Sequence, residues 1–231
     1  MAKRGVVIVA GGSGSRMKSV LPKQFLMLGG LPVVARTINT FSEALPGAEI
    51  VVVLPEEHVS LWENLRARFD VARHGVVVGG KERFHSVLNG INALSSEVEY
   101  IAVHDGVRAM VSKRLIIRAM LAAEEHGAVI PVVDVVDSYR RVDGEESYIV
   151  PRSELRIVQT PQVFRADLLK KAYEAIGARL DDRSKATDDA SVVEMYGHAV
   201  ALYEGEPQNL KLTTPTDLSV AEMILVNGTH L

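Results

Sequence analysis

One stretch decides the fold of this chain: Gly5-Val-Val-Ile-Val-Ala10, followed directly by Gly11-Gly-Ser-Gly-Ser15. A continuous β-branched run bounded by glycines is typical of a strand that is buried on both faces, as in a parallel sheet. The glycines that follow leave backbone N–H groups free to surround an anion. Two cations come next, Arg16 and, within the turn Leu21-Pro22-Lys23-Gln24-Phe25, Lys23. The stretch therefore indicates a phosphate-binding loop with two positive charges beside it.

Other glycine loops fit these residues less well. A Walker loop requires Gly-x-x-x-x-Gly-Lys-Ser/Thr, and the chain contains no such run. A dinucleotide-binding loop needs Gly or Ala at its third position for close helix packing, where this chain has Met17. A plain strand-to-helix turn stays open for the loop alone, although it explains neither Arg16 nor the turn at Pro22-Lys23-Gln24.

The composition indicates one α/β domain with an ordinary core. The chain has 231 residues, of which 47% are hydrophobic and 24% are charged. A formal net charge of -3 argues against a nucleic-acid binder with a basic surface, but it permits a local cationic pocket. The absence of cysteine excludes disulfides and thiolate chemistry. No apolar run reaches the ~18 residues of a membrane span, so we expect a soluble cytoplasmic protein.

Apolar periodicity predicts strands that alternate with helices, and hence a mostly parallel α/β sheet covered on both faces. A single domain over 1–231 is expected. Trp62 lies on the apolar stripe of the second helix and is predicted to be core. The predicted strands are 5–10, 49–54, 75–78, 100–103, 128–133 and 199–203. The predicted helices are 32–41, 57–69, 112–126 and 168–176, with others beginning near Gly79-Gly80, near Ala190 and at Thr216.

The alternation breaks at about 134–156, where two short runs flank an Asp143-Gly144 turn. This pattern predicts a hairpin with polar and apolar residues mixed on both strands. An isolated hairpin is marginal in water, so one that projects from the sheet needs a surface to pack on. We expect a partner subunit to supply that surface, which makes the segment a dimerisation β-arm. Packing on its own domain is the alternative.

Candidate functional residues follow several predicted strands, at the edge where open parallel sheets bind ligands. Cations that share a cleft with one carboxylate suit phosphoryl or nucleotidyl transfer, which needs charge stabilisation and alignment more than covalent help. Asp105 is then predicted to hold Mg²⁺. The candidate set is the glycine loop, Arg16, Lys23, Gly79-Gly80, Arg83, Ser86, Asp105, Arg108 and Lys211.

Each of these residues, taken singly, has a structural alternative. Lys23 and Lys211 could be solvated lysines, and Arg83 could pair locally with Glu82. Asp105 could be a turn residue. His104, beside it, is predicted to be a buried histidine at the strand end.

Motifs in six parts of the chain carry a resemblance to a known family. They are Ala10-Gly-Gly-Ser-Gly-Ser-Arg-Met17 with Pro22-Lys-Gln-Phe25, Gly79-Gly-Lys-Glu-Arg83 with Ser86, His104-Asp-Gly-Val-Arg108, Thr160-Pro-Gln162, Thr187-Asp-Asp-Ala-Ser191 and Asn209-Leu-Lys211. In this order, over nearly the whole chain, they resemble the 2-C-methyl-D-erythritol 4-phosphate cytidylyltransferases. Ala109 departs from the family, which usually has proline there, and Ser138 stands where threonine is common.

The resemblance implies a Rossmann-like fold of the nucleotide-diphospho-sugar transferase type. It also implies CTP as co-substrate, Mg²⁺ as cofactor and methylerythritol phosphate as the attacking substrate, with release of pyrophosphate in the non-mevalonate isoprenoid pathway. A homodimer completed by the β-arm is implied as well.

The residue roles are carried over by the same resemblance. The catalytic residues it implies are Arg16, Lys23, Lys211 and Asp105, with Asp105 also binding the metal. The nucleotide-binding residues are Ala10, Gly11, Gly12, Ser13, Gly14, Gly80, Arg83, Ser86 and Asp105. The substrate-binding residues are Arg108, Ser138, Arg152, Thr160, Thr187 and Lys211.

Two other functions stay open at this point. A cytidylyltransferase for another polyol phosphate, such as ribitol 5-phosphate, would share the CTP motifs, so the arm and the segment 187–191 would have to separate the two substrates. A non-catalytic module that senses CTP would tolerate loss of Arg16 and Lys23, yet both are present.

Overall fold

The computed structural model describes residues 2–12, 21–178 and 186–227. Within them, the central element is a mixed eight-stranded sheet of order β10-β7-β11-β6-β1-β4-β5, with β12 paired to β7. The predicted mostly parallel sheet is confirmed: β1 runs parallel to β4 and β6, β4 to β5, and β7 to β12. The strands are β1 (Arg4–Val9), β4 (Glu49–Leu54), β5 (Gly75–Val78), β6 (Tyr100–Asp105), β7 (Ala128–Asp134), β10 (Arg156–Val158), β11 (Gln162–Arg165) and β12 (Ala201–Glu204).

The antiparallel part of the sheet is formed by β10 and β11. β11 lies between β6 and β7 and runs antiparallel to both, and β10 is antiparallel to β7. The sequence pattern does not predict β11, because its four residues after Pro161 are too few to show the alternation that marks a strand. Its position matters for the site, since Gln162 pairs with Val103 near the end of β6 and Thr160, just before the strand, bonds to Asp105.

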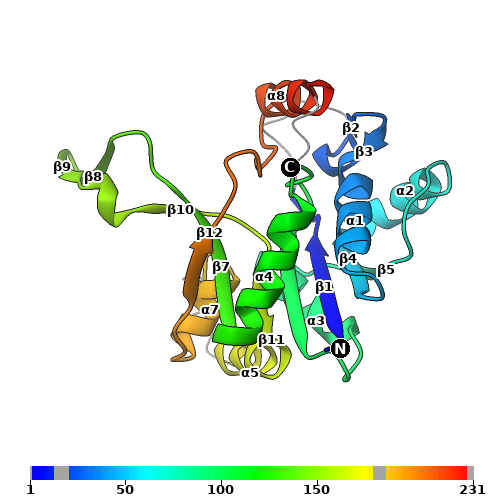
Figure 1. The fold of residues 1–231 in the computed structure, drawn as a ribbon, viewed down its shortest axis with the longest axis horizontal. Coiled ribbons are helices and arrows are strands. Elements are labelled where there is room, and N and C mark those ends of the chain that lie inside the picture. Colours follow the sequence, from blue (N-terminus) through cyan, green and yellow to red (C-terminus); the bar gives the residue numbers. More distant parts are fainter. Residues whose placement is uncertain (1, 13–20, 179–185, 228–231) are drawn as a thin grey trace.

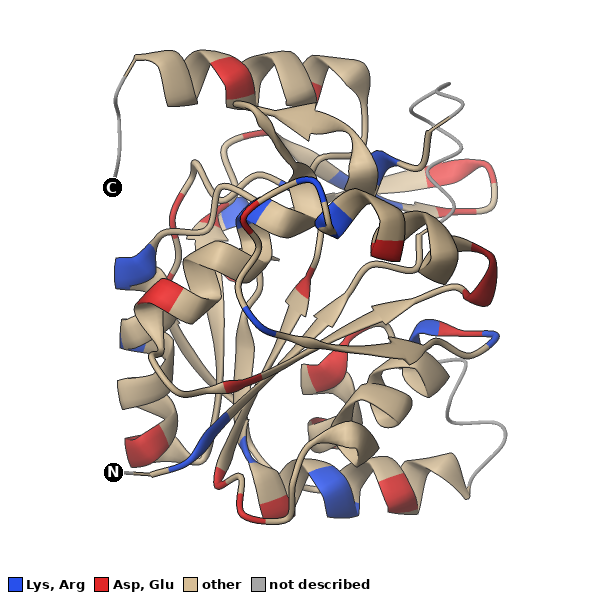
Figure 2. Ribbon diagram, turned by 90° about the vertical axis from the view of Figure 1, so that its right-hand side faces the viewer, with Lys and Arg blue, Asp and Glu red and all other residues tan. Residues whose placement is uncertain are grey.

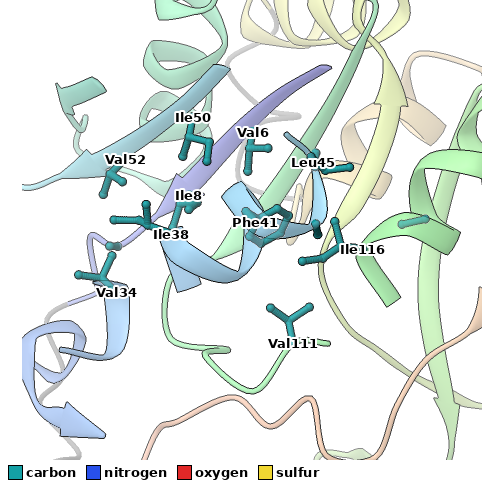
Figure 3. Close-up of a cluster of buried hydrophobic side chains, with 14 of the residues drawn as sticks. Val6, Ile8, Val34, Ile38, Phe41, Leu45, Ile50, Val52, Val111 and Ile116 are labelled. Atoms are coloured by element: carbon teal, nitrogen blue, oxygen red, sulfur yellow. The ribbon is translucent and has the colours of Figure 1, made fainter. Parts of the chain in front are cut away.

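Helices cover both faces of the sheet (Figure 1). Because side chains alternate along a strand, Val6 and Ile8 of β1 belong to one buried cluster and Val7 to the other. The first cluster packs on α1, α2 and α4, and Phe41 lies among its sheet residues in Figure 3. The second packs on α3, α5 and α7. The helices are α1 (Val33–Ala44), α2 (Glu56–Arg66), α3 (Arg83–Ala93), α4 (Lys113–His126), α5 (Ala166–Gly177) and α7 (Asp189–Met195).

Trp62 is part of this core, as predicted. Its side chain is fully buried, and its ring stacks on Phe25 with 5.9 Å between centroids. Phe25 ends the short helix η2 (Lys23–Phe25), and burial of its side chain contributes roughly 1.5–3 kcal/mol. The packing therefore anchors the turn that carries Lys23.

A third apolar cluster attaches the C-terminal helix α8 (Pro215–Val226) to the carboxyl end of the sheet. Leu212 and Ala221 pack there against Val107 and against Leu28 of the small hairpin β2 (Met27–Leu28) and β3 (Leu31–Pro32). The Leu212 N–H donates to the Val107 carbonyl at 3.0 Å. This bond holds the segment that contains Lys211 next to the turn after β6.

Side-chain caps define several helix starts. Ser112 accepts a bond from the N–H of Leu115 at 2.9 Å and so caps α4, and Gly127, at φ 78°, ends it. The helix predicted to begin near Ala190 is α7, and Asp188 and Ser191 form a capping box at its start. The helix predicted to begin near Gly79-Gly80 is displaced and starts at Arg83, after an extended Glu82.

The predicted hairpin is confirmed as β8 (Tyr139–Asp143) and β9 (Glu146–Val150), joined through Gly144 at φ 60°. It projects from the body of the protein at the far left of Figure 1. Apolar residues along the arm are largely exposed, including Val142 at 71% and Ile149 at 76%. The partner subunit that would cover them stays a prediction.

Charged residues of both signs are interspersed along the ribbon in Figure 2, in line with the formal net charge of -3. None of the described helices has the length and apolar character needed to cross a membrane.

Candidate active site

A cavity of about 280 Å³ lies at the carboxyl ends of β1, β5 and β6. It brings together residues that the sequence places far apart, and most of them belong to the predicted site. The lining residues are Val9, Ala10, Gly11, Gly12, Lys23, Gly80, Lys81, Glu82, Arg83, Ser86, Asp105, Val107 and Lys211. A cavity of about 380 Å³ between α1, α4 and α8 contains none of the predicted site residues.

Two glycine segments form the walls of the smaller cavity. Gly80 lies against the first turn of α3, where a Cβ would stand 2.3 Å from Cβ of His85, and its N–H donates to Ser86 Oγ at 3.1 Å. Across the cavity, a Cβ on Gly12 would lie 3.6 Å from the Lys23 ammonium nitrogen. A side chain at position 80 would collide with His85, so backbone rather than a side chain lines the cavity there. Ser13, Gly14 and Arg16, predicted to belong to this loop, lie outside the described residues.

Asp105 ends β6 and is the centre of charge in the cavity. Its Oδ2 lies 2.9 Å from Lys211 Nζ and 3.5 Å from Arg108 Nε, and its side chain is 13% exposed. Burial raises the pKa of this carboxyl, but Lys211, Arg83 and Arg108 together outweigh burial and lower the pKa to about 2. Asp105 is therefore ionised at neutral pH.

A divalent metal fits this carboxylate only if the substrate supplies most of the ligands. No group of three or more His, Asp or Glu side chains is placed to hold a metal ion in the described part of the chain. Both ion pairs of Asp105 use Oδ2. Mg²⁺ commonly takes one or two carboxylates and completes its shell with phosphate and water. The donor set therefore suits Mg²⁺ that arrives with a nucleoside triphosphate.

In this structure Arg108 bonds to backbone carbonyl groups. Its guanidinium is buried and donates to the Asn209 carbonyl at 2.9 Å and to the Val158 carbonyl at 3.4 Å. It therefore ties the turn after β6 to the segments around 158 and 209. A contact with substrate stays a prediction, and Ala109 leaves the turn closed, since the Arg108 N–H donates to the Asp105 carbonyl at 2.9 Å.

Thr160 and His104 hold the turn between Asp105 and Arg108 in place. The Asp105 N–H donates to Thr160 Oγ1 at 3.1 Å, and Thr160 Oγ1 lies 3.0 Å from His104 Nδ1. His104 Nε2 lies 3.3 Å from the Arg108 carbonyl, which can only accept, so Nε2 carries the proton and Nδ1 accepts from the Thr160 hydroxyl. The prediction of a buried His104 is confirmed, with 0% exposed. Thr160, predicted to bind substrate, bonds to the backbone that carries Asp105.

His104 makes the stability of the fold depend on pH. Burial lowers its pKa from the ordinary 6.5 to about 3, so the unfolded chain binds a proton that the folded chain refuses between these values. Above pH 6.5 His104 does not reduce the free energy of unfolding. Below pH 6.5 this free energy falls on acidification, by ~1.4 kcal/mol per pH unit. Urea titrations at pH 7, 6 and 5 should show that the free energy of unfolding falls less with decreasing pH in His104→Gln than in the wild type. Parallel declines would contradict this assignment.

Arg83 has a partner that sequence reasoning missed. Its Nη1 and Nη2 atoms lie 3.0 and 2.6 Å from the two carboxylate oxygens of Asp189, a residue with no exposed surface. Tyr173 also donates to Asp189 Oδ1, at 2.6 Å. Burial opposes the charge of Arg83, but Asp189 outweighs it and raises the pKa of the guanidinium. The local pairing with Glu82 is not the arrangement that the structure shows. Only the acidic pair at 188–189 signalled such a partner.

The remaining predicted substrate residues do not reach the cavity within one chain. Ser138 and Arg152 belong to the arm region and are exposed, and Arg152 Nη1 donates to the Val136 carbonyl at 3.2 Å. Thr187 is exposed just before α7. The structure thus places Lys23, Asp105 and Lys211 together but keeps Ser138 and Arg152 apart from them.

The comparison with known proteins identifies the family. Residues 5–227 match the family model for 2-C-methyl-D-erythritol 4-phosphate cytidylyltransferase. The chain belongs to this family. Curated cytidylyltransferases of that name from Bacteroides fragilis and Geobacillus kaustophilus are 47% and 41% identical to it, each over 96% of this chain and over 99% and 96% of their own lengths.

Solved structures of this cytidylyltransferase family share the fold. The 4-diphosphocytidyl-2C-methyl-D-erythritol synthase of Anaerococcus prevotii superimposes with a TM-score of 0.83 at 28% identity, covering 97% of this chain and 99% of that one. The cytidylyltransferase of Francisella tularensis gives 0.81 at 28% identity, covering 96% and 99%. The Rossmann-like nucleotidyltransferase fold expected from the motifs is thereby confirmed.

Proposed function

We propose that this protein transfers CMP from CTP to 2-C-methyl-D-erythritol 4-phosphate. The products are 4-diphosphocytidyl-2-C-methyl-D-erythritol and pyrophosphate, in the non-mevalonate route to isoprenoid precursors. The observation that carries the proposal is the cavity at the sheet edge, which joins Gly11 and Gly12 with Lys23, Asp105 and Lys211 in a chain that matches the family over 5–227.

The proposed reaction forms one P–O bond and breaks another. A phosphate oxygen of the polyol phosphate attacks the α-phosphorus of CTP, and pyrophosphate leaves from the opposite side with the electron pair of the broken bond. Lys23 and Lys211 would stabilise the negative charge on the phosphorus oxygens during this exchange. The ion pair between Lys211 and Asp105 holds the lysine at the cavity wall.

We propose Mg²⁺ as the cofactor, with Asp105 as its protein ligand and the triphosphate supplying the other oxygens. When bound, the ion would offset charge on the triphosphate and on the leaving pyrophosphate. The ionised state of Asp105 and the single-carboxylate donor set support this assignment.

We also propose that the active enzyme is a homodimer in which each arm completes the partner's site. The exposed apolar residues of the arm and the separation of Ser138 and Arg152 from their own cavity support this arrangement. Cyclic dimers are the commonest oligomers, and such an interface would cover the arm of each subunit with the other.

The arm predicts a specific result in mixed dimers. Arg152→Ala should raise KM for the polyol phosphate, because the arm would lose the cation that binds its phosphate, and KM for CTP should change little. Mixing Arg152→Ala with Lys23→Ala protein should restore part of the activity, since one of the two sites then has both residues intact. Steady-state rates of the mixture, compared with each variant alone, test this. Rates no higher than the sum of the separate variants would argue against shared sites.

The proposed activity is tested by pyrophosphate release from CTP and Mg²⁺, with methylerythritol 4-phosphate and ribitol 5-phosphate assayed in parallel. We expect kcat/KM to favour methylerythritol phosphate by ~100-fold, equivalent to ~2.7 kcal/mol of discrimination. Preference for ribitol phosphate would change the assigned substrate but keep the CTP site. Binding of CTP without turnover of either phosphate would favour a sensing module.

A further inference from the structure

Asp189 is a buried acid that does not line the cavity, yet it pairs with Arg83, which does. Its carboxylate pairs with both terminal nitrogens of Arg83 and accepts a bond from Tyr173. The Asp189 side chain has no exposed surface, whereas 32% of the Arg83 side chain is exposed. A buried carboxylate is stable only when it is paired and hydrogen-bonded, so the two elements that carry this pair are held in one relative position.

On one side, the pair fixes the nucleotide cradle. Arg83 is the first residue of α3, the helix whose first turn supplies Ser86, and Ser86 Oγ accepts the Gly80 N–H at 3.1 Å. Gly80, Arg83 and Ser86 all line the cavity. A shift of Arg83 would therefore move the part of the cavity wall that the start of α3 forms.

On the other side, the pair fixes the segment that begins α7. Asp189 is the first residue of that helix and lies two residues after Thr187. Gln162 of β11 holds the same turn: its Oε1 accepts the N–H groups of Asp189 and Ala190 at 3.1 and 2.9 Å, and its Nε2 donates to Asp188 at 2.7 Å. The position of Thr187 thus depends on β11 and on the ion pair to α3.

From these contacts we infer that Asp189 is a positioning residue that couples the two substrate sites, so that binding of one substrate favours binding of the other. The inference rests on the proposed function, in which the cradle binds CTP and the segment at Thr187 contacts the polyol phosphate. A ligand that immobilises Arg83 also immobilises the start of α7, and the second ligand then has less conformational entropy to lose. Coupling of this kind is reciprocal between the two ligands.

The test measures this coupling directly by calorimetry on the full-length protein. The Kd of methylerythritol phosphate is measured with and without saturating α,β-methylene-CTP, an analogue in which the bond to be broken is replaced. In the wild type the nucleotide should lower this Kd by ~5-fold or more, and the polyol phosphate should lower the Kd of the analogue by the same factor. In Asp189→Asn both ratios should fall to within about twofold of one.

Tyr173→Phe is the matched control, because it removes one bond to the same carboxylate and leaves the pair with Arg83 intact. Tyr173→Phe should keep the wild-type ratio of Kd values. If the cluster had a purely structural role, Tyr173→Phe and Asp189→Asn would instead change this ratio alike. Arg83→Lys, which keeps the charge but cannot pair through two nitrogens, should give an intermediate ratio and serves if Asp189→Asn does not fold.

The outcomes separate the inference from the proposed function. If the two Kd values of methylerythritol phosphate, with and without the nucleotide, were equal in a wild-type enzyme that turns over this substrate, the coupling would be contradicted and the proposed function would stand. An unchanged ratio in Asp189→Asn would contradict the coupling as well. A wild-type protein that neither binds nor converts methylerythritol phosphate would overturn both.

Discussion

Replacing Lys23 with alanine is expected to lower kcat by ~10²-fold or more while CTP affinity stays within a few-fold, the scale of one lost transition-state donor. The ammonium group of Lys23 lies at the wall of the cavity beside Gly12, on a turn held by the stacking of Phe25 on Trp62. Negative charge on the α-phosphate grows during attack, so a cation there stabilises the transition state more than bound CTP.

Single-turnover rates and CTP binding, measured separately on the same Lys23→Ala protein, check this expectation. Lys113→Ala is a suitable control, because Lys113 of α4 pairs with Glu43 of α1 at 3.1 Å and lines the cavity of about 380 Å³ rather than the candidate site. It should keep kcat within about twofold, as surface ion pairs contribute little. Equal losses of CTP affinity and turnover in Lys23→Ala would show that the lysine binds the ground state and would remove its catalytic assignment.

Asp105→Asn is expected to lower kcat by ~10²–10³-fold at fixed Mg²⁺, as for loss of one group that stabilises transition-state charge, and to raise the Mg²⁺ concentration for half-maximal activity. The substitution keeps the shape of the side chain but removes the charge that pairs with Lys211 and Arg108. Three cations near this carboxyl, including Arg83, hold its pKa at about 2. In the variant Lys211 and Arg108 would lack their carboxylate partner, so the metal would lose its proposed ligand and meet a more positive site.

Initial rates over a Mg²⁺ titration, with CTP saturating, measure this effect. Chelation of Mg²⁺ should abolish wild-type activity and its return should restore it. Asp167→Asn is the matched control, because Asp167 pairs with Arg165 at 2.7 Å at the opposite end of the sheet and should leave the titration unchanged. A normal Mg²⁺ titration in Asp105→Asn would exclude the carboxylate as metal ligand, whatever the loss in kcat.

Asp105 also shows which pH dependence to expect. A carboxyl whose pKa is lowered from 3.8 to about 2 stabilises the fold above pH 3.8, and its contribution is lost only as the pH falls through that range. It therefore stays charged throughout the physiological range. The loss of stability on mild acidification is assigned to His104, whose shift covers pH 6.5 to about 3.

The sequence by itself determined the features that depend on residues close together along the chain. β-branched runs bounded by glycine or proline predict β1 and β4 to within a residue, since the side-chain period of a strand is local. The placement of Asp105 at the ligand edge also follows, because parallel strands end at one edge of the sheet. The hairpin at 139–150 was marked by its Asp143-Gly144 turn.

Only the tertiary structure decided the partners of the long polar side chains and the path of the short strands. Arg83 meets Asp189 across 106 positions, and Arg108 meets Asn209 across 101, so neither contact leaves a periodic trace in the sequence. β11 lies between β6 and β7 because pairing there buries Val163 and Phe164 between the two helical layers. An arginine can bind a phosphate or a carboxylate with the same guanidinium. Which of them it binds is settled by what the folded chain brings within hydrogen-bonding distance.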